Sequence, residues 1–175
     1  MKKRNLGVLL LGIWVTLCSF QKSRKVPVNE TKVSTPFGQL KILTPDFSKC
    51  IEFNIAKFGA VKGDKEQTSQ AIAKAINAAS TAGGGIVVVP EGEWLTKKIH
   101  LKSNVNLRID KGGVLLFSES PEDYLPAVHT TWEGMECLNY SPLIYAYQCK
   151  NVAISGEGEI KAQMDTWKQW FSRPP

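Results

Sequence analysis

Residues 103–109 read Ser-Asn-Val-Asn-Leu-Arg-Ile, and residues 150–155 read Lys-Asn-Val-Ala-Ile-Ser. Each stretch contains a polar turn with Asn and continues as a strand in which apolar and polar side chains alternate. The apolar side chains from Val105 to Ile109, and from Val152 to Ile154, would therefore point to one side of the chain and into a continuous interior. This repeat favours a solenoid of stacked coils over a β-sandwich or a β-barrel, which short strands alone would also allow.

Further short apolar runs lie between turns rich in Gly, Pro, Ser and Asn, as is typical of an all-β protein. They cover residues 86–89, 99–101, 114–117 and 143–147. We expect each run to form one strand of a coil. The domain that these coils build is expected to span residues 51–175.

The only long helical pattern precedes these strands and extends from Gln67 to Ala82. Its apolar residues recur at helical spacing, namely Ala71, Ile72, Ala75, Ile76 and Ala79. Thr68 or Ser69 is the candidate N-cap, and three glycines at 83–85 end the helix. A helix in this place would cover the open first coil, as terminal caps do in stacked arrays.

The first 50 residues differ from the rest of the chain. Residues 1–20 have a positively charged start and a short apolar run from Leu6 to Leu17, which predicts a signal peptide and no transmembrane span. Cys18 is the candidate site for a lipid anchor, with simple secretion as the alternative. Residues 21–50 are expected to form a spacer with at most a short strand around Leu40–Leu43. The product would be secreted, periplasmic or anchored at a bacterial outer membrane.

The formal net charge of +6 has its origin at the N-terminus. Six of the 22 Lys and Arg residues lie within the first 25 residues, where there is no acidic residue. The remainder of the chain is balanced and shows no basic stripe, so we expect no nucleic-acid partner. Composition leaves the oligomeric state open.

Cys50, Cys137 and Cys149 follow the signal region, and three cysteines cannot all pair within one chain. Because no Cys-x-x-Cys occurs, we expect no zinc site. We expect the three side chains to be buried as small hydrophobic groups, with a Cys137–Cys149 disulfide as the alternative.

Aromatic residues gather between Tyr124 and Tyr147, where we select three candidate substrate-binding residues: Trp132, Glu133 and Tyr140. Sugars present C–H faces that pack on aromatic rings, and hydroxyls that hydrogen-bond to carboxylates. A long loop of this kind could therefore form part of a carbohydrate groove. The alternative is that Trp132 and Tyr140 only pack the loop onto the wall of the solenoid.

Two further patterns are assigned structural roles. Trp167, Trp170 and Phe171 have the spacing of one apolar helical face and are expected in the core. Glu122 and Asp123 stand side by side in a loop flanked by prolines, and we expect them to form a solvated surface.

Five segments follow one another in a recognisable order: Phe58-Gly59-Ala60, the run from Gly83 to Trp94, Leu101-Lys102-Ser103-Asn104-Val105, Gly113-Val114-Leu115-Leu116, and Ile154-Ser155-Gly156-Glu157-Gly158-Glu159-Ile160. Over about residues 51–171 this series resembles the N-terminal third of glycoside hydrolase family 28, the polygalacturonase family of the pectin-lyase-like proteins. The resemblance implies a right-handed parallel β-helix with an N-terminal capping helix. It also implies a secreted hydrolase that cleaves pectin-type polysaccharides next to uronic acids, with inversion and without a metal or cofactor.

The same resemblance implies which catalytic groups are missing. The family hydrolyses its substrate with Asn-x-Asp, Asp-Asp, Gly-His-Gly and Arg-x-Lys motifs on later coils, and this sequence contains none of the four. We therefore assign no catalytic residue, expect a β-helix truncated on its C-terminal side, and expect this fragment alone to be inactive. The rival functions are a non-catalytic carbohydrate-binding β-helix and a pectin-type lyase, which would use calcium.

Overall fold

The computed structural model describes residues 26–168 and residue 170, and its central part consists of three parallel sheets. The first sheet contains β3 (Ile51–Asn54), β4 (Gly85–Val89), β7 (Val105–Ile109) and β12 (Ala153–Gly156); the second contains β5 (Gly92–Thr96), β8 (Gly113–Phe117) and β13 (Glu159–Ala162); the third contains β6 (Ile99–His100) and β11 (Ile144–Tyr145).

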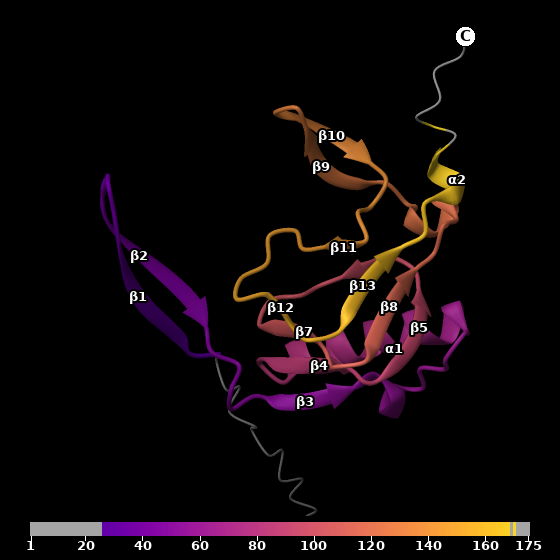
Figure 1. Cartoon of the computed structure of the whole chain (residues 1–175), viewed down its shortest axis with the longest axis horizontal. Helices are drawn as coiled ribbons and strands as arrows, with labels where there is room; N and C mark the ends of the chain where they lie inside the picture. The colour runs from indigo at the N-terminus through magenta and orange to yellow at the C-terminus, as the bar shows by residue number, and fades with distance from the viewer. Residues whose placement is uncertain (1–25, 169, 171–175) are drawn as a thin grey trace, which may run out of the picture.

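The chain passes through the three sheets in turn and then returns to the first (Figure 1). β4, β5 and β6 make one circuit, β7, β8 and β11 make the next, and β12 and β13 begin a third. Each strand pairs in parallel with the strand one circuit earlier. This is the connectivity of a parallel β-helix, so the expected strand-rich solenoid is confirmed.

Side chains at matching positions of successive coils form columns in the interior. Val87 lies beside Leu107, and Leu107 lies beside Ile154. Val105, Leu107 and Ile109 are buried as predicted, and each such side chain contributes about 1.5–3 kcal/mol of hydrophobic stabilisation. Ile154 belongs to the same column but is 50 % exposed, since no described strand lies on its other side.

The repeated Asn marks the same corner of two successive coils. Asn104 and Asn151 have φ angles of 65° and 53°, in the left-handed region that Asn tolerates better than most residues. The side-chain Nδ2 of Asn151 donates to Oδ1 of Asn104 at 2.9 Å. The two stretches therefore share an Asn because the backbone is left-handed at this corner of each coil.

Helix α1 (Lys65–Thr81) begins two residues earlier than expected. Its N-cap is Asp64, whose carboxylate accepts the backbone N–H of Gln67 at 2.9 Å, so the assignment of Thr68 or Ser69 as the N-cap is wrong. The sequence pattern missed this because the first helical turn is polar, and only later residues face the core.

One side of α1 packs against the first coil. The five apolar residues that were predicted to share a face are all buried, together with Thr68. Ile72, Ala75, Ile76 and Ala79 join the core cluster that contains Val87, Val89 and Trp94. The helix contacts β3, β4 and β5, so it lies at the N-terminal end of the coils.

Residues 28–45 form an extended hairpin, and the expectation of at most a short strand is wrong. β1 (Val28–Thr35) pairs antiparallel with β2 (Gly38–Pro45) along its whole length. The hairpin projects away from the coils in Figure 1. Both of its faces are largely exposed, so its sequence carries little apolar periodicity and looks like a spacer.

The compact part starts before Ile51. Val26 and Phe47, on either side of the hairpin, are buried against Ile86 and Val88. These two β4 residues point away from the interior because they alternate with inward-facing neighbours. The outer face of the first sheet is thus partly covered by the segments that flank the hairpin.

The three cysteines are free and partly exposed, so neither the expected burial nor a Cys137–Cys149 disulfide is found. Cys137 lies on a projecting hairpin, and Cys149 follows β11, where its thiol donates to the carbonyl of Leu101 at 3.5 Å. No helix within the described residues is long and apolar enough to cross a membrane. The expected signal peptide and Cys18 lie outside the described residues.

Candidate functional site

The second coil carries a long insertion between β8 and β11. It contains the short 3-10 helix η2 (Pro121–Tyr124) and a hairpin of β9 (Val128–Trp132) and β10 (Met135–Asn139). A short helix, α2 (Asp165–Lys168), follows β13 and lies beside this insertion in Figure 1. Because β13 pairs with β8, the chain returns after β13 to the place where the insertion begins.

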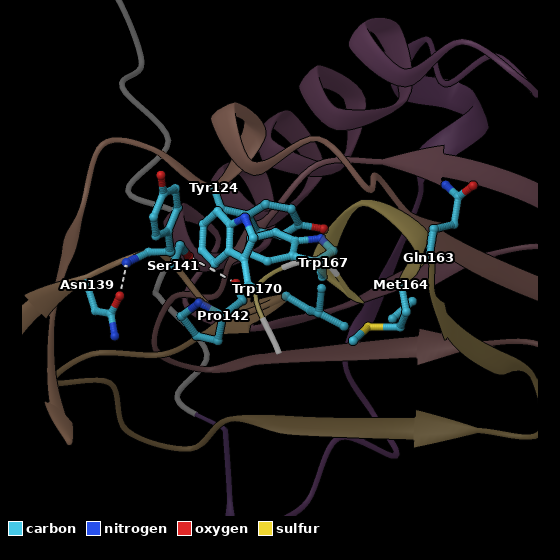
Figure 2. A pocket seen from close by; sticks show the side chains of 11 residues that line it. Tyr124, Asn139, Ser141, Pro142, Gln163, Met164, Trp167 and Trp170 are labelled. Carbon is cyan, nitrogen blue, oxygen red and sulfur yellow. Dashed lines mark hydrogen bonds between the residues drawn. The ribbon is translucent and has the colours of Figure 1, made fainter. Parts of the chain in front are cut away.

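A cavity of about 430 Å³ lies between the insertion and α2, and Figure 2 shows the side chains around it. Its lining is mainly aromatic and aliphatic, and consists of Tyr124, Asn139, Tyr140, Ser141, Pro142, Leu143, Ala162, Gln163, Met164, Trp167 and Trp170. This volume falls within the range of typical small-molecule sites.

The rings of Tyr124, Tyr140, Trp167 and Trp170 form an aromatic wall of the cavity. Trp167 is at the centre of this wall. Its ring makes edge-to-face contacts with Tyr124, Tyr140 and Trp170, at centroid distances of 5.6, 6.1 and 4.9 Å. Tyr140 and Trp170 also meet each other at 5.6 Å. Such arrangements are the favoured packing of aromatic pairs, so the four rings support one another.

Hydrogen bonds to the backbone hold the wall of the cavity in place. The Tyr124 hydroxyl donates to the carbonyl of Ser118 at 2.5 Å, and the backbone N–H of Ser141 donates to the carbonyl of Tyr124 at 3.0 Å. The side-chain amide of Gln163 donates to the carbonyl of Phe117 at 3.0 Å. Burial, with a smaller effect of the Asp123 charge, raises the pKa of Tyr124 to about 12.

Asp123 is part of an ion-pair network, so the expectation of a solvated surface is wrong for this residue. Its side chain is 10 % exposed, and its carboxylate contacts Lys65 Nζ at 2.5 Å, Ser118 Oγ at 2.5 Å and Lys97 Nζ at 3.4 Å. Burial raises the pKa of Asp123, but these donors outweigh burial and hold it below its usual range. Glu122 is exposed, as expected.

Other cations near the cavity are also engaged. The Lys98 ammonium donates to the backbone carbonyls of Asp123 and Leu125. On α2, Lys168 pairs with Asp165 at 2.6 Å. The lysines around the aromatic wall therefore already have anionic or carbonyl partners.

The three predicted substrate-binding residues do not come together. Trp132 and Glu133 lie at the tip of the β9–β10 hairpin, whereas Tyr140 lies at its base and lines the aromatic cavity. Trp132 is 62 % exposed and contributes, with Met135 and Leu138, to a second cavity of about 400 Å³ on the hairpin. Sequence proximity thus grouped residues that belong to two different surfaces.

Trp167 and Trp170 line the cavity and are not core residues. Trp170 is 53 % exposed, and Phe171 lies outside the described residues. The spacing of these aromatic residues indicates an apolar helical face, but it does not reveal which residues this face contacts. Only the register between β13 and β8 brings these rings to Tyr140.

A second group of rings lies at the third sheet. His100 contacts Tyr145, Tyr145 contacts Tyr147, and Tyr147 contacts His129, at centroid distances of 5.1, 6.0 and 5.3 Å. Burial and the neighbouring Lys98 lower the pKa of His100, which favours its neutral form.

The aromatic cavity offers mainly apolar ring faces to a ligand. Its described lining contains no carboxylate, Lys, Arg or His, and its polar groups are the amides and hydroxyls of Asn139, Gln163, Ser141 and the two tyrosines. No cluster of His, Cys, Asp and Glu in the described part of the chain could hold a metal ion.

Comparison with known proteins identifies the relatives of the coiled part. Residues 52–110 match the family described as "Rhamnogalacturonase A/epimerase, pectate lyase-like". A "Probable polygalacturonase" from Vitis vinifera is 27 % identical over 126 residues, which cover 67 % of this chain and 26 % of that protein.

Two solved structures are similar over most of the chain. The hyperthermoactive exopolygalacturonase from Thermotoga maritima has a TM-score of 0.62 and 43 % sequence identity, over 67 % of this chain and 26 % of that one. The family 28 exopolygalacturonase from Yersinia enterocolitica has a TM-score of 0.56 and 27 % identity, over 78 % of this chain and 26 % of that one. The resemblance to polygalacturonases is thus confirmed over this part, and the chain spans about a quarter of the length of these relatives.

Proposed function

From this relationship to polygalacturonases, we propose that the chain supplies the first coils of a pectin-type polysaccharide hydrolase. The observation that supports the proposal best is the 43 % identity to an exopolygalacturonase across two thirds of the chain. The parallel coils of this chain would extend the same scaffold, with α1 closing its N-terminal end.

We further propose that the hydrolytic groups lie outside these 175 residues. Inverting hydrolysis needs an acid on one side of the glycosidic bond and a carboxylate about 6.5–9.5 Å away that activates water. None of the four family motifs occurs in the sequence, and no carboxylate lines the aromatic cavity in the described part. Within the complete protein, Trp132, Glu133 and Tyr140 remain proposed contacts to the polysaccharide.

The test is to read the DNA beyond the codon for Pro175 and to express the product that it encodes. An Asn-x-Asp and a Gly-His-Gly motif are expected, together with reducing ends of inverted anomeric configuration when NMR follows the cleavage of polygalacturonate. Unsaturated products would assign a lyase instead. A product without these motifs that releases no reducing ends would contradict the hydrolase.

One observation favours a second candidate, a non-catalytic carbohydrate-binding β-helix. The aromatic cavity has ring faces but no carboxylate, Lys, Arg or His among its described lining residues, which suits a binding surface. This candidate predicts that a gel containing the polysaccharide retards the encoded product. It also predicts that the product does not shorten the polysaccharide.

We also propose that the protein is exported by the segment 1–20, with Cys18 either lipidated or removed. The charged and apolar pattern of residues 2–17 supports this. Mass spectrometry of cell fractions should find a mature N-terminus at or after Cys18, outside the cytoplasm. An intact Met1 in the cytoplasmic fraction would contradict export.

A further inference from the structure

The aromatic cavity lacks what a site for free uronic acids needs. Its described lining has no cationic side chain, and nearby ammonium groups are engaged, as Lys65 is with Asp123 and Lys168 with Asp165. An ionised carboxylate that entered the cavity would lose its hydration without gaining a cationic partner, which is costly.

The cavity is suited to an uncharged sugar ring. The rings of Tyr140, Trp167 and Trp170 offer apolar surface. Pro142 and Met164 extend this surface with aliphatic groups (Figure 2). Trp170 is half exposed, so a ligand can reach this wall from solvent.

Few polar groups of the lining remain to orient a ligand. The Gln163 amide is bonded to the carbonyl of Phe117, and the Ser141 hydroxyl donates to the carbonyl of Pro142 at 3.0 Å. Because these groups are engaged in holding the wall, the cavity would recognise its ligand chiefly by shape and apolar contact.

We propose that this cavity binds a methyl-esterified galacturonosyl residue of pectin in preference to the free galacturonate. The inference rests on the proposed function, which supplies the galacturonate backbone. The ester removes the charge that the cavity cannot pair, and its methyl group adds contact with the aliphatic part of the wall. The sugar face packs on the exposed tryptophan ring.

The described lining has no carboxylate or cationic side chain, and burial raises the pKa of the Tyr124 phenol to about 12. Binding is therefore expected to be nearly insensitive to salt, in contrast to recognition of polygalacturonate by cations.

The test uses the whole 175-residue chain and one pectin sample in two forms, methyl-esterified and enzymatically de-esterified. Binding is measured by retardation of the protein in a gel that contains the polysaccharide, and by the change in tryptophan fluorescence. A neutral galactan serves as the third ligand. Trp170→Ala should weaken binding to the esterified form about fivefold or more. The matched control is Phe37→Ala, because Phe37 is fully exposed at the tip of the β1–β2 hairpin.

Preference for the esterified form, lost in Trp170→Ala and kept in Phe37→Ala, is the expected result. Equal or stronger binding of the de-esterified form, or of the galactan, would overturn the inference and leave the proposed function intact. No binding of any form, or no effect of Trp170→Ala, would equally overturn it. The proposed function fails separately, through the motifs and cleavage products of the encoded protein.

Discussion

At Gly156 the chain turns from β12 to β13 with a φ of 109°, directly against the backbone of Ile109 in the preceding coil. A Cβ at this position would overlap with the carbonyl group of Ile109, and an L side chain would also be strained at this φ. Stacking of coils therefore requires glycine at position 156, because a side chain there would overlap with a residue of the preceding coil.

Gly156→Ala should lower the free energy of unfolding by about 3 kcal/mol, measured by urea denaturation. The control is Gly59→Ala, at a φ of 93° with nothing within 4 Å of the added Cβ, which should cost about 1 kcal/mol from backbone strain alone. Equal losses in the two variants would show that the contact with Ile109 does not matter.

Asp123 makes stability depend on pH, because its carboxylate is held by Lys65, Ser118 and Lys97. Its folded pKa lies below the unfolded value of about 3.9, so its stabilisation is complete above that value and is lost as pH falls through the folded pKa. Asp123→Asn should lower the free energy of unfolding by about 1–3 kcal/mol at pH 7, and by less near pH 3.

Urea denaturation of wild type and variant across pH 3–7 measures this effect. Glu119→Gln, an exposed change in the same loop, is the control and should leave the profile nearly unchanged. A difference between wild type and Asp123→Asn that is the same at both ends of this pH range would refute the role of the charge.

Among the elements, those that bury a periodic apolar face were predictable and those that do not were missed. The helix face from Ala71 to Ala79 and the strand β7 follow directly from the sequence, because their periodicity reports the core. The β1–β2 hairpin buries little, so its strands show no such pattern. The N-cap Asp64 was missed because capping depends on local hydrogen bonds and not on apolar spacing.

Two phenylalanines distinguish the exposed hairpin from the segment that anchors it. Phe47→Ala should cost about 3–5 kcal/mol of stability, since this ring is buried against Ile86 and Val88. Phe37→Ala at the exposed tip should change the thermal midpoint very little. Similar midpoints for the two variants would show that Phe47 does not pack on the first sheet.

At the scale of the whole molecule, the coil order was predictable because the turn and strand sequence repeats, whereas the aromatic cavity was not. Tyr140 and Trp167 meet because β13 pairs with β8. The spacing of residues along the sequence does not predict which distant strands pair, or in which register. The same limit explains why Trp132 and Glu133 were grouped with Tyr140, which lies at the other end of the hairpin.

We propose that this chain supplies scaffold and binding surface while the groups for hydrolysis lie elsewhere. The most direct test is to assay the purified 175-residue chain for reducing ends released from polygalacturonate and from methyl-esterified pectin. We expect no release above the heat-denatured control. Release that persists through purification and is abolished by Glu133→Gln, a carboxylate within this chain, would contradict the account.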